Sequence, residues 1–282
     1  MSDFSVSGPL TDAALAPENG KTVQLLNPIL NLTEAQLFEL AESIIVAILH
    51  REGEGVSPRL SVHFGMWGRM NLTYAFLKEP SGGFLEIGRC REVTEFLKLT
   101  ESRPKLKYLV MIDNDEGIEW DAPLRLAAHA LPIVSGVVCA YTDQKGIFAC
   151  FTAKDRNGMA RFPSLQLTQK LPATGLKEVV HAGTGLLCVR RDVFETLLAR
   201  DEYPFLLDDE TRRRSAQEGV VKKGEDIVFC ERASAAGFPI YVDFSVRAVH
   251  YKTLGLGWPI EQIDPALDAA EWYPASFDAR LP

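Results

Sequence analysis

The chain has 282 residues, of which 46% are hydrophobic and 24% are charged. This composition is typical of a globular protein with a substantial core and excludes a mainly disordered chain. The formal net charge of −8 disfavours the broad basic surface that binds nucleic-acid backbones. Nucleic acid is therefore an unfavoured partner.

Two further features bear on where the protein works. No basic segment followed by an apolar core begins the chain, and nowhere do about 18 apolar residues run uninterrupted. The five cysteines are widely spaced and lie mostly in apolar runs. Such cysteines predict reduced core thiols and not a disulfide framework or a zinc site. We therefore expect a cytoplasmic protein with no transmembrane segment.

The N-terminal part of the chain divides into an irregular arm and a helix. Residues 1–30 carry several turn-forming glycines and prolines and predict no regular element. From Asn31 to Ile48 apolar residues recur at helical spacing, which predicts one amphipathic helix that ends before Gly53. We expect residues 1–57 to form an extension that packs on the main domain or contributes to a homo-oligomer contact.

The rest of the chain alternates between strand and helix patterns. Strands are predicted at 59–65, 108–112, 133–138, 183–189 and 240–243, and helices at 88–99, 121–130, 192–198 and 225–236. Gly82-Gly83 predicts a turn, 144–175 is turn-rich, and 208–223 predicts a solvated loop. This rhythm predicts an α/β domain over 58–255, with a parallel sheet flanked by helices, and a tail at 256–282 packed on it.

An acidic run at the end of the predicted strand 108–112 is the strongest candidate for a functional site. Asp113, Asp115 and Glu116 follow that strand directly, and ligands of open α/β sheets bind at the carboxyl ends of strands. Asp113 and Asp115 are spaced to bind a hard divalent cation that leaves positions for diphosphate oxygens. The alternative is an acidic turn that merely ends a strand, and such triplets are common.

Polar groups in two later segments agree with this interpretation. Glu225 and Asp226 begin a predicted helix, and His250 and Lys252 follow the last predicted strand. The carboxylates are suited to take a proton from an attacking hydroxyl, and Lys252 is suited to bind phosphate. Each residue also has a structural explanation, because helix dipoles favour acids in a first turn and single histidines usually lie hydrogen-bonded in a core.

The order of these motifs resembles the GT-A glycosyltransferases, particularly small bacterial and phage members related to family 2. The likeness rests on Asp113-Asn114-Asp115 at a strand end, then IVSGVV, HAGTGLLCVRRDVFE, GEDIVFCERASAAGFPIYVD and VHYKT. It implies a GT-A, Rossmann-like fold with a mixed, mainly parallel sheet. It also implies transfer of a sugar from a nucleotide-diphosphate donor of UDP or GDP type to a hydroxyl of an unidentified acceptor.

The resemblance further implies roles for individual residues. A divalent metal, Mn²⁺ or Mg²⁺, would be bound by Asp113, Asp115 and His250. The catalytic base facing the acceptor would be Asp226 or Glu225, and direct displacement with such a base favours inversion. Donor contacts are implied or suggested for Arg89, Arg91, Asp113 and Lys252. Acceptor contacts are implied for Gly183 and Thr184, and Trp258 is a candidate for stacking on a sugar.

Two other functions stay open from the sequence. A nucleotidyltransferase acting on a sugar phosphate needs a glycine-rich basic loop after its first strand, and FGMWGRMN supplies only two glycines and one arginine. A non-catalytic GT-A-like domain that binds a glycan or nucleotide would have no need of so many acidic groups in these segments.

Overall fold

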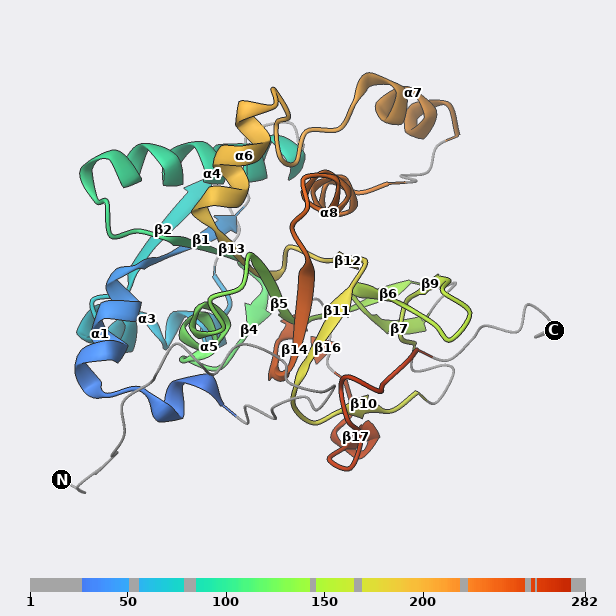
Figure 1. Cartoon of the computed structure of the whole chain (residues 1–282), viewed down its shortest axis with the longest axis horizontal. Helices are drawn as coiled ribbons and strands as arrows, with labels where there is room; N and C mark the ends of the chain where they lie inside the picture. Colours follow the sequence, from blue (N-terminus) through green and yellow to red (C-terminus); the bar gives the residue numbers. More distant parts are fainter. Residues whose placement is uncertain are drawn as a thin grey trace.

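The computed structural model describes residues 27–50, 56–78, 85–142, 146–164, 169–218, 223–251, 255–256 and 258–274. At its centre lies a seven-stranded sheet with the order β11-β14-β5-β13-β3-β1-β2 (Figure 1). Its strands are β1 (Ile44–His50), β2 (Thr73–Lys78), β3 (Tyr108–Asp113), β5 (Ile133–Val137), β11 (Leu176–Val179), β13 (Leu186–Arg190) and β14 (Ile240–Arg247).

Most strands of this sheet share one direction. β1 is parallel to β2 and β3, and β5 is parallel to β14. β13 lies between β3 and β5 and is antiparallel to both, and β11 is antiparallel to β14. The predicted α/β class with a mixed, mainly parallel sheet is confirmed. Parallel strands of this kind place their carboxyl ends, including the end of β3, along one edge.

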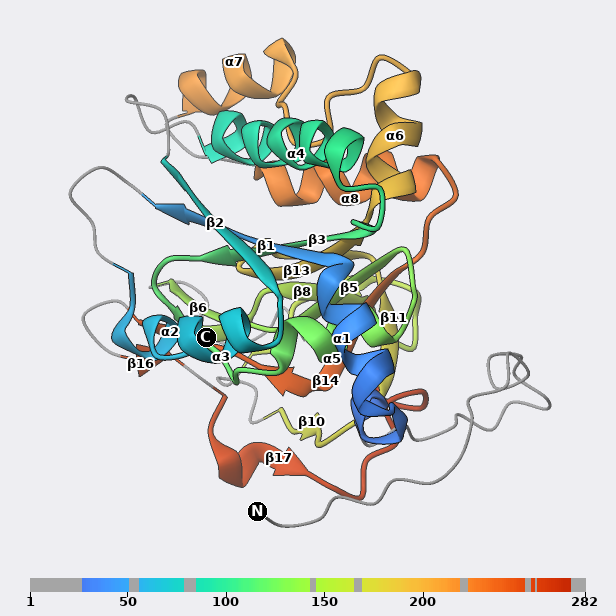
Figure 2. The ribbon, with the colours of Figure 1, turned by 90° about the vertical axis from the view of Figure 1, so that its left-hand side faces the viewer.

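Helices cover both faces of the sheet (Figure 2). One face packs against α4 (Leu85–Ser102), α6 (Arg191–Ala199) and α8 (Glu225–Ala235), and the other against α1 (Glu34–Glu42), α2 (Pro58–Ser61), α3 (Phe64–Arg69) and α5 (Ala122–Ala128). Two single-turn 3₁₀ helices, η2 (Pro28–Asn31) and η4 (Ile260–Gln262), lie near the ends of the described chain.

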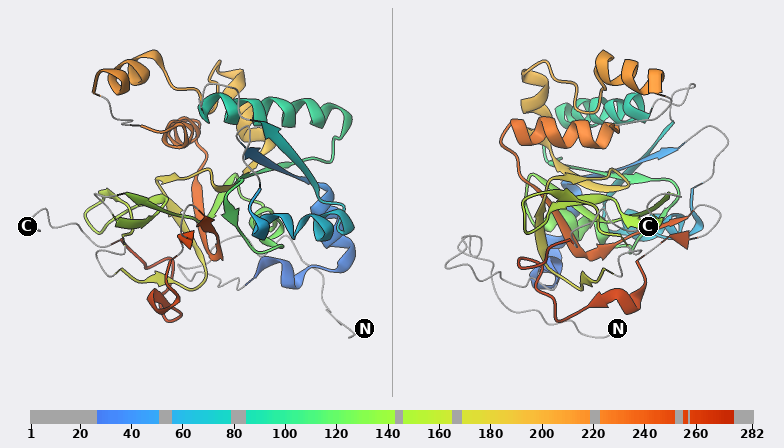
Figure 3. Two further views of the ribbon diagram at one scale, coloured as in Figure 1. Left: turned by 180° about the vertical axis from the view of Figure 1, so that it is seen from behind. Right: turned by 90° about the vertical axis from the view of Figure 1, so that its right-hand side faces the viewer.

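Short strands form four small sheets outside the central sheet (Figure 3). They are β4 (Glu116–Gly117), β6 (Cys139–Thr142), β7 (Gly146–Ala149), β8 (Phe151–Lys154), β9 (Ala160–Arg161), β10 (Leu171–Pro172), β12 (His181–Ala182), β15 (Val249–Tyr251), β16 (Gly255–Leu256) and β17 (Ile263–Asp264). The turn-rich region 144–175 therefore carries several short strands.

The helix predicted over residues 31–48 is wrong in its second half. α1 begins after the Thr33 capping box and ends at Glu42, and the next residue, Ser43, is its C-cap. Ile44–His50 then forms β1, which is buried along almost its whole length. A strand buried on both faces has no polar alternation, so its apolar residues also fit a helical period. A strand of the central sheet thus comes from the segment 1–57.

The strand predicted over residues 59–65 is also wrong, because these residues belong to α2 and α3. Pro58 occupies the first turn of α2, where its fixed φ favours a helix. Trp67 of α3 is fully buried, and its Nε1 donates to the Trp120 carbonyl at 2.7 Å. The apolar alternation in this stretch reflects two short helices that each bury one large side chain.

The segment 208–223, predicted as a solvated loop, contains the helix α7 (Asp209–Glu218). The Asp208 carboxylate accepts a hydrogen bond from the Thr211 backbone at 2.6 Å, and Glu210 pairs with Arg213 one turn along. This helix has no apolar face, so hydrophobic periodicity could not reveal it. The other predicted helices and the strands at 108–112, 133–138, 183–189 and 240–243 are confirmed to within a few residues. The turn at Gly82-Gly83 lies outside the described residues.

The described part of the tail packs on the domain. The Trp272 side chain is 5% exposed, and its Nε1 donates to the Lys170 carbonyl at 2.9 Å. Its ring also meets Phe244 of β14 edge to face. No described helix is both long and apolar enough to cross a membrane. All five cysteines are free thiols, as predicted, and Cys139, Cys188 and Cys230 are buried.

A buried polar pair fixes α5 against the sheet. His129, the C-cap of α5, donates from Nε2 to Asp243 Oδ2 of β14 at 2.8 Å. The other oxygen of Asp243 accepts from the backbone N–H and the hydroxyl of Ser245. Burial alone would raise the pKa of Asp243, but the hydrogen bonds from His129 and Ser245 outweigh it and lower the pKa below its usual value.

This pair predicts an acid-dependent loss of stability. A carboxyl group whose pKa is lowered on folding stabilises the fold above its unfolded pKa, about 3.9, and that stabilisation is lost as pH falls through the folded value. We expect Asp243→Asn to lower the free energy of unfolding by about 2 kcal/mol at pH 7. Urea unfolding between pH 7 and 3 should show a smaller loss for the variant than for the parent. Parallel pH profiles would contradict this assignment.

Candidate functional site

The acidic run follows β3 and is held in place by a small antiparallel ladder. β4 pairs with β15 so that Glu116 lies opposite His250, and the Tyr251 backbone N–H donates to the Asp115 carbonyl at 2.7 Å. Directly opposite residues of an antiparallel pair present their side chains on the same face. This pairing brings the acidic run next to a histidine that follows it by more than a hundred residues.

Three side chains of this ladder form a group with the dimensions of a metal site. One ligand atom from each of Asp115, Glu116 and His250 lies within 4.8 Å of the others, and Asp115 Oδ2 lies 3.2 Å from His250 Nε2. Glu116 is fully buried. The sequence pointed to Asp113, Asp115 and His250. The structure groups Asp115 and His250 as expected but adds Glu116, while Asp113 is not part of this group.

The hydrogen bonding of His250 suits a metal ligand. Both ring nitrogens face acceptor oxygens: Nδ1 lies 3.2 Å from the Cys139 carbonyl, and Nε2 lies 3.2 Å from Asp115 Oδ2. In the tautomer that donates from Nδ1 to the carbonyl, Nε2 keeps a lone pair that can bind a cation shared with Asp115. Metal-binding histidines commonly donate their second N–H to a backbone carbonyl in this way. Two carboxylates and one imidazole form a donor set compatible with Mn²⁺.

Asp113 has a different partner. Its Oδ1 accepts from Nη2 of Arg89, which is fully buried on α4, and Arg89 Nη1 donates to Glu92 Oε2 at 2.9 Å. Burial disfavours the charged guanidinium, but the negative charges of Glu92 and Asp113 raise the pKa of Arg89. Burial raises the pKa of Glu92 to about 7, against the opposing effect of Arg89. Arg89, which was predicted to contact the nucleotide-sugar donor, is therefore buried and contacts the Asp113 carboxylate.

Gly185 lies against both acidic groups. A Cβ at this position would be 3.1 Å from Glu116 Oε1 and 3.4 Å from Asp113 Oδ2. The Gly185 carbonyl also accepts from the Asp113 backbone N–H at 3.2 Å. The glycine thus lets the start of β13 approach the carboxylates closely, which a larger residue would prevent.

The predicted acid pair lies near the same segment, at Gly183, two residues before Gly185. Glu225 and Asp226 form the first turn of α8, and a Cβ on Gly183 would be 3.9 Å from Asp226 Oδ2. Burial, and then the charge of Asp226, raise the pKa of Glu225 to about 7. Burial also raises the pKa of Asp226. Because Glu225 also interacts electrostatically with Asp113 and Arg89, the structure brings the two predicted acidic groups into one site.

Two of the remaining predicted contacts are buried, and a third faces away from the acidic groups. Thr184 is 5% exposed, and Trp258 is 8% exposed with its backbone beside the Cys139 thiol. Trp258 is therefore not the exposed stacking platform that the sequence suggested. Arg91 is exposed on α4, and a residue two positions from the buried Arg89 projects from the opposite side of a helix. Lys252 lies outside the described residues.

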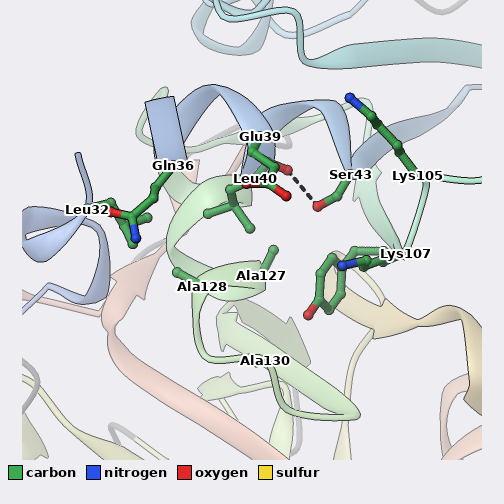
Figure 4. Close-up of a pocket in the computed structure, with 11 residues that line it drawn as sticks. Leu32, Gln36, Glu39, Leu40, Ser43, Lys105, Lys107, Ala127, Ala128 and Ala130 are labelled. Carbon is green, nitrogen blue, oxygen red and sulfur yellow. Dashed lines mark hydrogen bonds between the residues drawn. The ribbon is translucent and has the colours of Figure 1, made fainter. Parts of the chain in front are cut away.

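A pocket of about 290 Å³ lies away from this site (Figure 4). It is lined by one side of α1, the end of α5 and the residues that lead into β3, including Gln36, Leu40, Ser43, Lys107 and Tyr108. Tyr108 begins β3 and Asp113 ends it, so this pocket and the acidic groups occupy opposite ends of one strand. None of the predicted site residues lines it.

No family model and no curated protein matches the chain. Among solved structures, it is similar to A197 from STIV, with 15% identity, a TM-score of 0.48, and coverage of 84% of this chain and 99% of that one. It is similar to GalNAc-T7, solved with UDP, GalNAc and Mn²⁺, with 12% identity, a TM-score of 0.42, and coverage of 83% and 45%. It is also similar to a nucleoside-diphosphate-sugar pyrophosphorylase from Vibrio cholerae RC9, with 12% identity, a TM-score of 0.34, and coverage of 73% and 78%. All three TM-scores are below 0.5, so the function of this chain has to follow from its site.

Proposed function

We propose that the protein is a metal-dependent glycosyltransferase of the GT-A type, which transfers a sugar from a nucleotide-diphosphate donor to an acceptor hydroxyl. One observation carries this proposal. The group Asp115, Glu116 and His250 and the acid pair Glu225 and Asp226 both approach a single short segment, 183–185, at the carboxyl end of β3. The first group offers ligands for a divalent ion, and the second offers groups able to accept a proton.

The negative charge of the site supports binding of the nucleotide-diphosphate donor through a cation. Five acidic side chains gather there, namely Asp113, Asp115, Glu116, Glu225 and Asp226. Such a site repels a free diphosphate, and a bound divalent cation reverses the local field. When bound to Asp115, Glu116 and His250, Mn²⁺ or Mg²⁺ would supply electrostatic stabilisation for the departing nucleotide diphosphate.

The acid pair Glu225 and Asp226 is suited to take the proton of the acceptor hydroxyl. A general base works best when its pKa lies near the working pH, and burial moves the pKa of Glu225 to about 7 and raises that of Asp226. Asp226 lies beside Gly183, the segment expected to face the acceptor. We assign Asp226 as the base that takes the hydroxyl proton, because burial raises its proton affinity. Direct displacement of this kind corresponds to inversion.

The alternative of a nucleotidyltransferase is less well supported. It requires a glycine-rich phosphate-binding loop in the stretch 64–71, but six of these residues form α3, with Trp67 buried. The backbone N–H groups of Trp67 and Met70 donate to the carbonyls of His63 and Met66, as in an α-helix and not in an open loop. The stretch therefore lacks the open loop of backbone donors that this reaction needs.

A thermal-shift panel of UDP, GDP, CDP and dTDP sugars, with and without Mn²⁺, tests the proposal. At about 100 times Kd a ligand stabilises a protein by about 2.7 kcal/mol, which raises Tm by several degrees. We expect one nucleotide class to raise Tm only with Mn²⁺, and we expect Asp115→Ala and His250→Ala to lose this response. Glu119→Gln is the matched control, since Glu119 follows the acidic run but pairs with Arg125. Absence of any nucleotide-dependent shift in the parent would refute the proposal.

Gly185→Ala should weaken metal binding. The added methyl would lie 3.1 Å from Glu116 Oε1, so the carboxylate would have to move away from Asp115 and His250. Changing the surroundings that hold a metal ligand in position commonly lowers metal affinity by 10–100-fold. We therefore expect the Kd for Mn²⁺, measured by calorimetry, to rise by about 10-fold or more. Gly65→Ala is the control, because a Cβ there meets nothing within 4 Å. Unchanged Mn²⁺ affinity in Gly185→Ala would remove Glu116 from the ligand set.

Asp226→Asn should separate catalysis from binding. An amide cannot accept the proton, so Mn²⁺-stimulated hydrolysis of the donor found in the panel should fall by about 100-fold, with little change in Mn²⁺ affinity. Because burial raises the pKa of Asp226, and that of its neighbour Glu225 to about 7, the parent rate should increase with pH as this pair loses its protons. Glu231→Gln, also on α8, is the control. A parent rate that is flat from pH 5.5 to 8.5 would argue against a base in this pair.

A further inference from the structure

A buried ion triad links α4 to the end of β3. Arg89 bonds to Glu92 one turn along the same helix and to Asp113 at the end of the strand. The side chains of Arg89 and Glu92 are fully buried, whereas the side chain of Asp113 is 32% exposed. The triad therefore begins deep between α4 and the sheet and ends with a carboxylate that reaches the surface of the site.

Packing alone does not account for this triad. Arg89 Nε and Glu92 Oε1 are both buried and have no hydrogen-bond partner among the described residues, and buried polar atoms left unsatisfied cost stability. Apolar residues of similar volume often replace a buried ion triad with no loss of stability. An incompletely bonded charged triad at the edge of a site therefore indicates a role in the chemistry of that site.

The geometry of Asp113 shows what this role is. Arg89 fixes Oδ1 of Asp113, and Oδ2 lies beside Gly185, with part of the carboxylate exposed to the site. The cation group consists of Asp115, Glu116 and His250 without Asp113. The guanidinium cannot itself reach a ligand, because Arg89 has no exposed surface. Its effect on a ligand has to pass through the carboxylate that it holds.

We propose that Arg89 is a positioning residue that fixes the Asp113 carboxylate for the nucleotide-diphosphate donor, while Asp115, Glu116 and His250 alone hold the cation. This inference rests on the proposed function. It assigns two functions to the acidic run. Asp113 accepts hydrogen bonds from N–H or O–H groups of the nucleotide-diphosphate donor, and Asp115 and Glu116 bind the metal. Glu92 keeps Arg89 in place by balancing its charge from behind.

The test replaces the buried pair without leaving a single charge unpaired. In Arg89→Met/Glu92→Gln, both buried charges are removed together and the volumes are roughly kept. The probes are Mn²⁺ alone, and UDP or GDP in the presence of saturating Mn²⁺, each measured by calorimetry. We expect the Kd of the nucleotide to rise by about 10-fold or more, because Asp113 is no longer oriented, and the Kd of Mn²⁺ to stay within about 3-fold.

The same helix supplies a matched control. Glu95 and Lys98 of α4 have the same three-residue spacing and form an ion pair at the surface, so Glu95→Gln/Lys98→Met makes the same chemical change away from the site. We expect it to bind both probes like the parent. Asp113→Asn tests the inference without touching the buried pair and should reproduce the loss of nucleotide affinity with Mn²⁺ affinity retained. Arg89→Lys should give an intermediate Kd, because an ammonium cannot bond to both acids as the guanidinium does.

The outcomes separate this inference from the function on which it rests. If the parent binds nucleotide with Mn²⁺ and both Asp113→Asn and the double variant bind it equally well, the triad is only structural and the inference is overturned. If these variants lose Mn²⁺ together with nucleotide, Asp113 belongs to the metal site and the inference is again overturned. If the parent binds Mn²⁺ but none of the four nucleotide classes of the thermal-shift panel, the proposed function fails, and the inference fails with it.

Discussion

The candidate site depends on the two-residue ladder between β4 and β15. Without the pairing of Glu116 with His250, the acidic run would be a surface turn, and the histidine would lie at the end of an unrelated strand. Backbone hydrogen bonds of this kind set side-chain positions to within a fraction of an ångström, which a metal site requires. The Tyr251-to-Asp115 bond extends the ladder by one residue, so the backbone that carries all three ligands is fixed from both strands.

A buried arginine and raised pKa values explain how so many acidic groups share a small volume. Arg89 compensates part of the negative charge directly, through its bonds to Asp113 and Glu92. The rest is relieved by raised pKa values, such as that of Glu225 at about 7. Like charges in a partly desolvated site cannot all ionise without a cation. Glu225 is therefore partly protonated near neutral pH, and a divalent ion bound nearby would favour its ionised form.

The central elements and the acidic segments could be predicted from the sequence because each has a local signal. β3 is a short apolar run that ends in acids, and α8 begins with Gly224 and two acids and ends before Gly237. β1 could not be distinguished from a helix because both its faces are buried, and α7 was missed because it has no apolar face. Hydrophobic periodicity detects a contrast between a buried face and an exposed face, and neither β1 nor α7 has this contrast.

The composition of the site was less predictable than its location. Asp113 and Glu116 belong to one acidic run, and nothing in the run itself tells which of its members bind an ion. Two long-range contacts make that distinction: the ladder places Glu116 beside His250, and the buried Arg89 binds Asp113. The resemblance to GT-A glycosyltransferases had implied that Arg89 contacts the nucleotide-sugar donor. Only the packing of α4 on the sheet shows that its guanidinium is enclosed.

The segment 183–185 joins the two halves of the proposed chemistry. Gly185 lies against Glu116 and Asp113, and Gly183 lies against Asp226. Residues two apart along a chain cannot be separated by more than about 7 Å, so the proposed cation ligands and the proposed base approach the same short stretch of backbone. A Cβ on Gly183 would lie 3.0 Å from the Cys150 Cβ, and a Cβ on Gly185 would lie 3.1 Å from Glu116 Oε1, so the two glycines let this backbone pack closely against both neighbours. The antiparallel insertion of β13 between β3 and β5 places this backbone at the carboxyl end of β3.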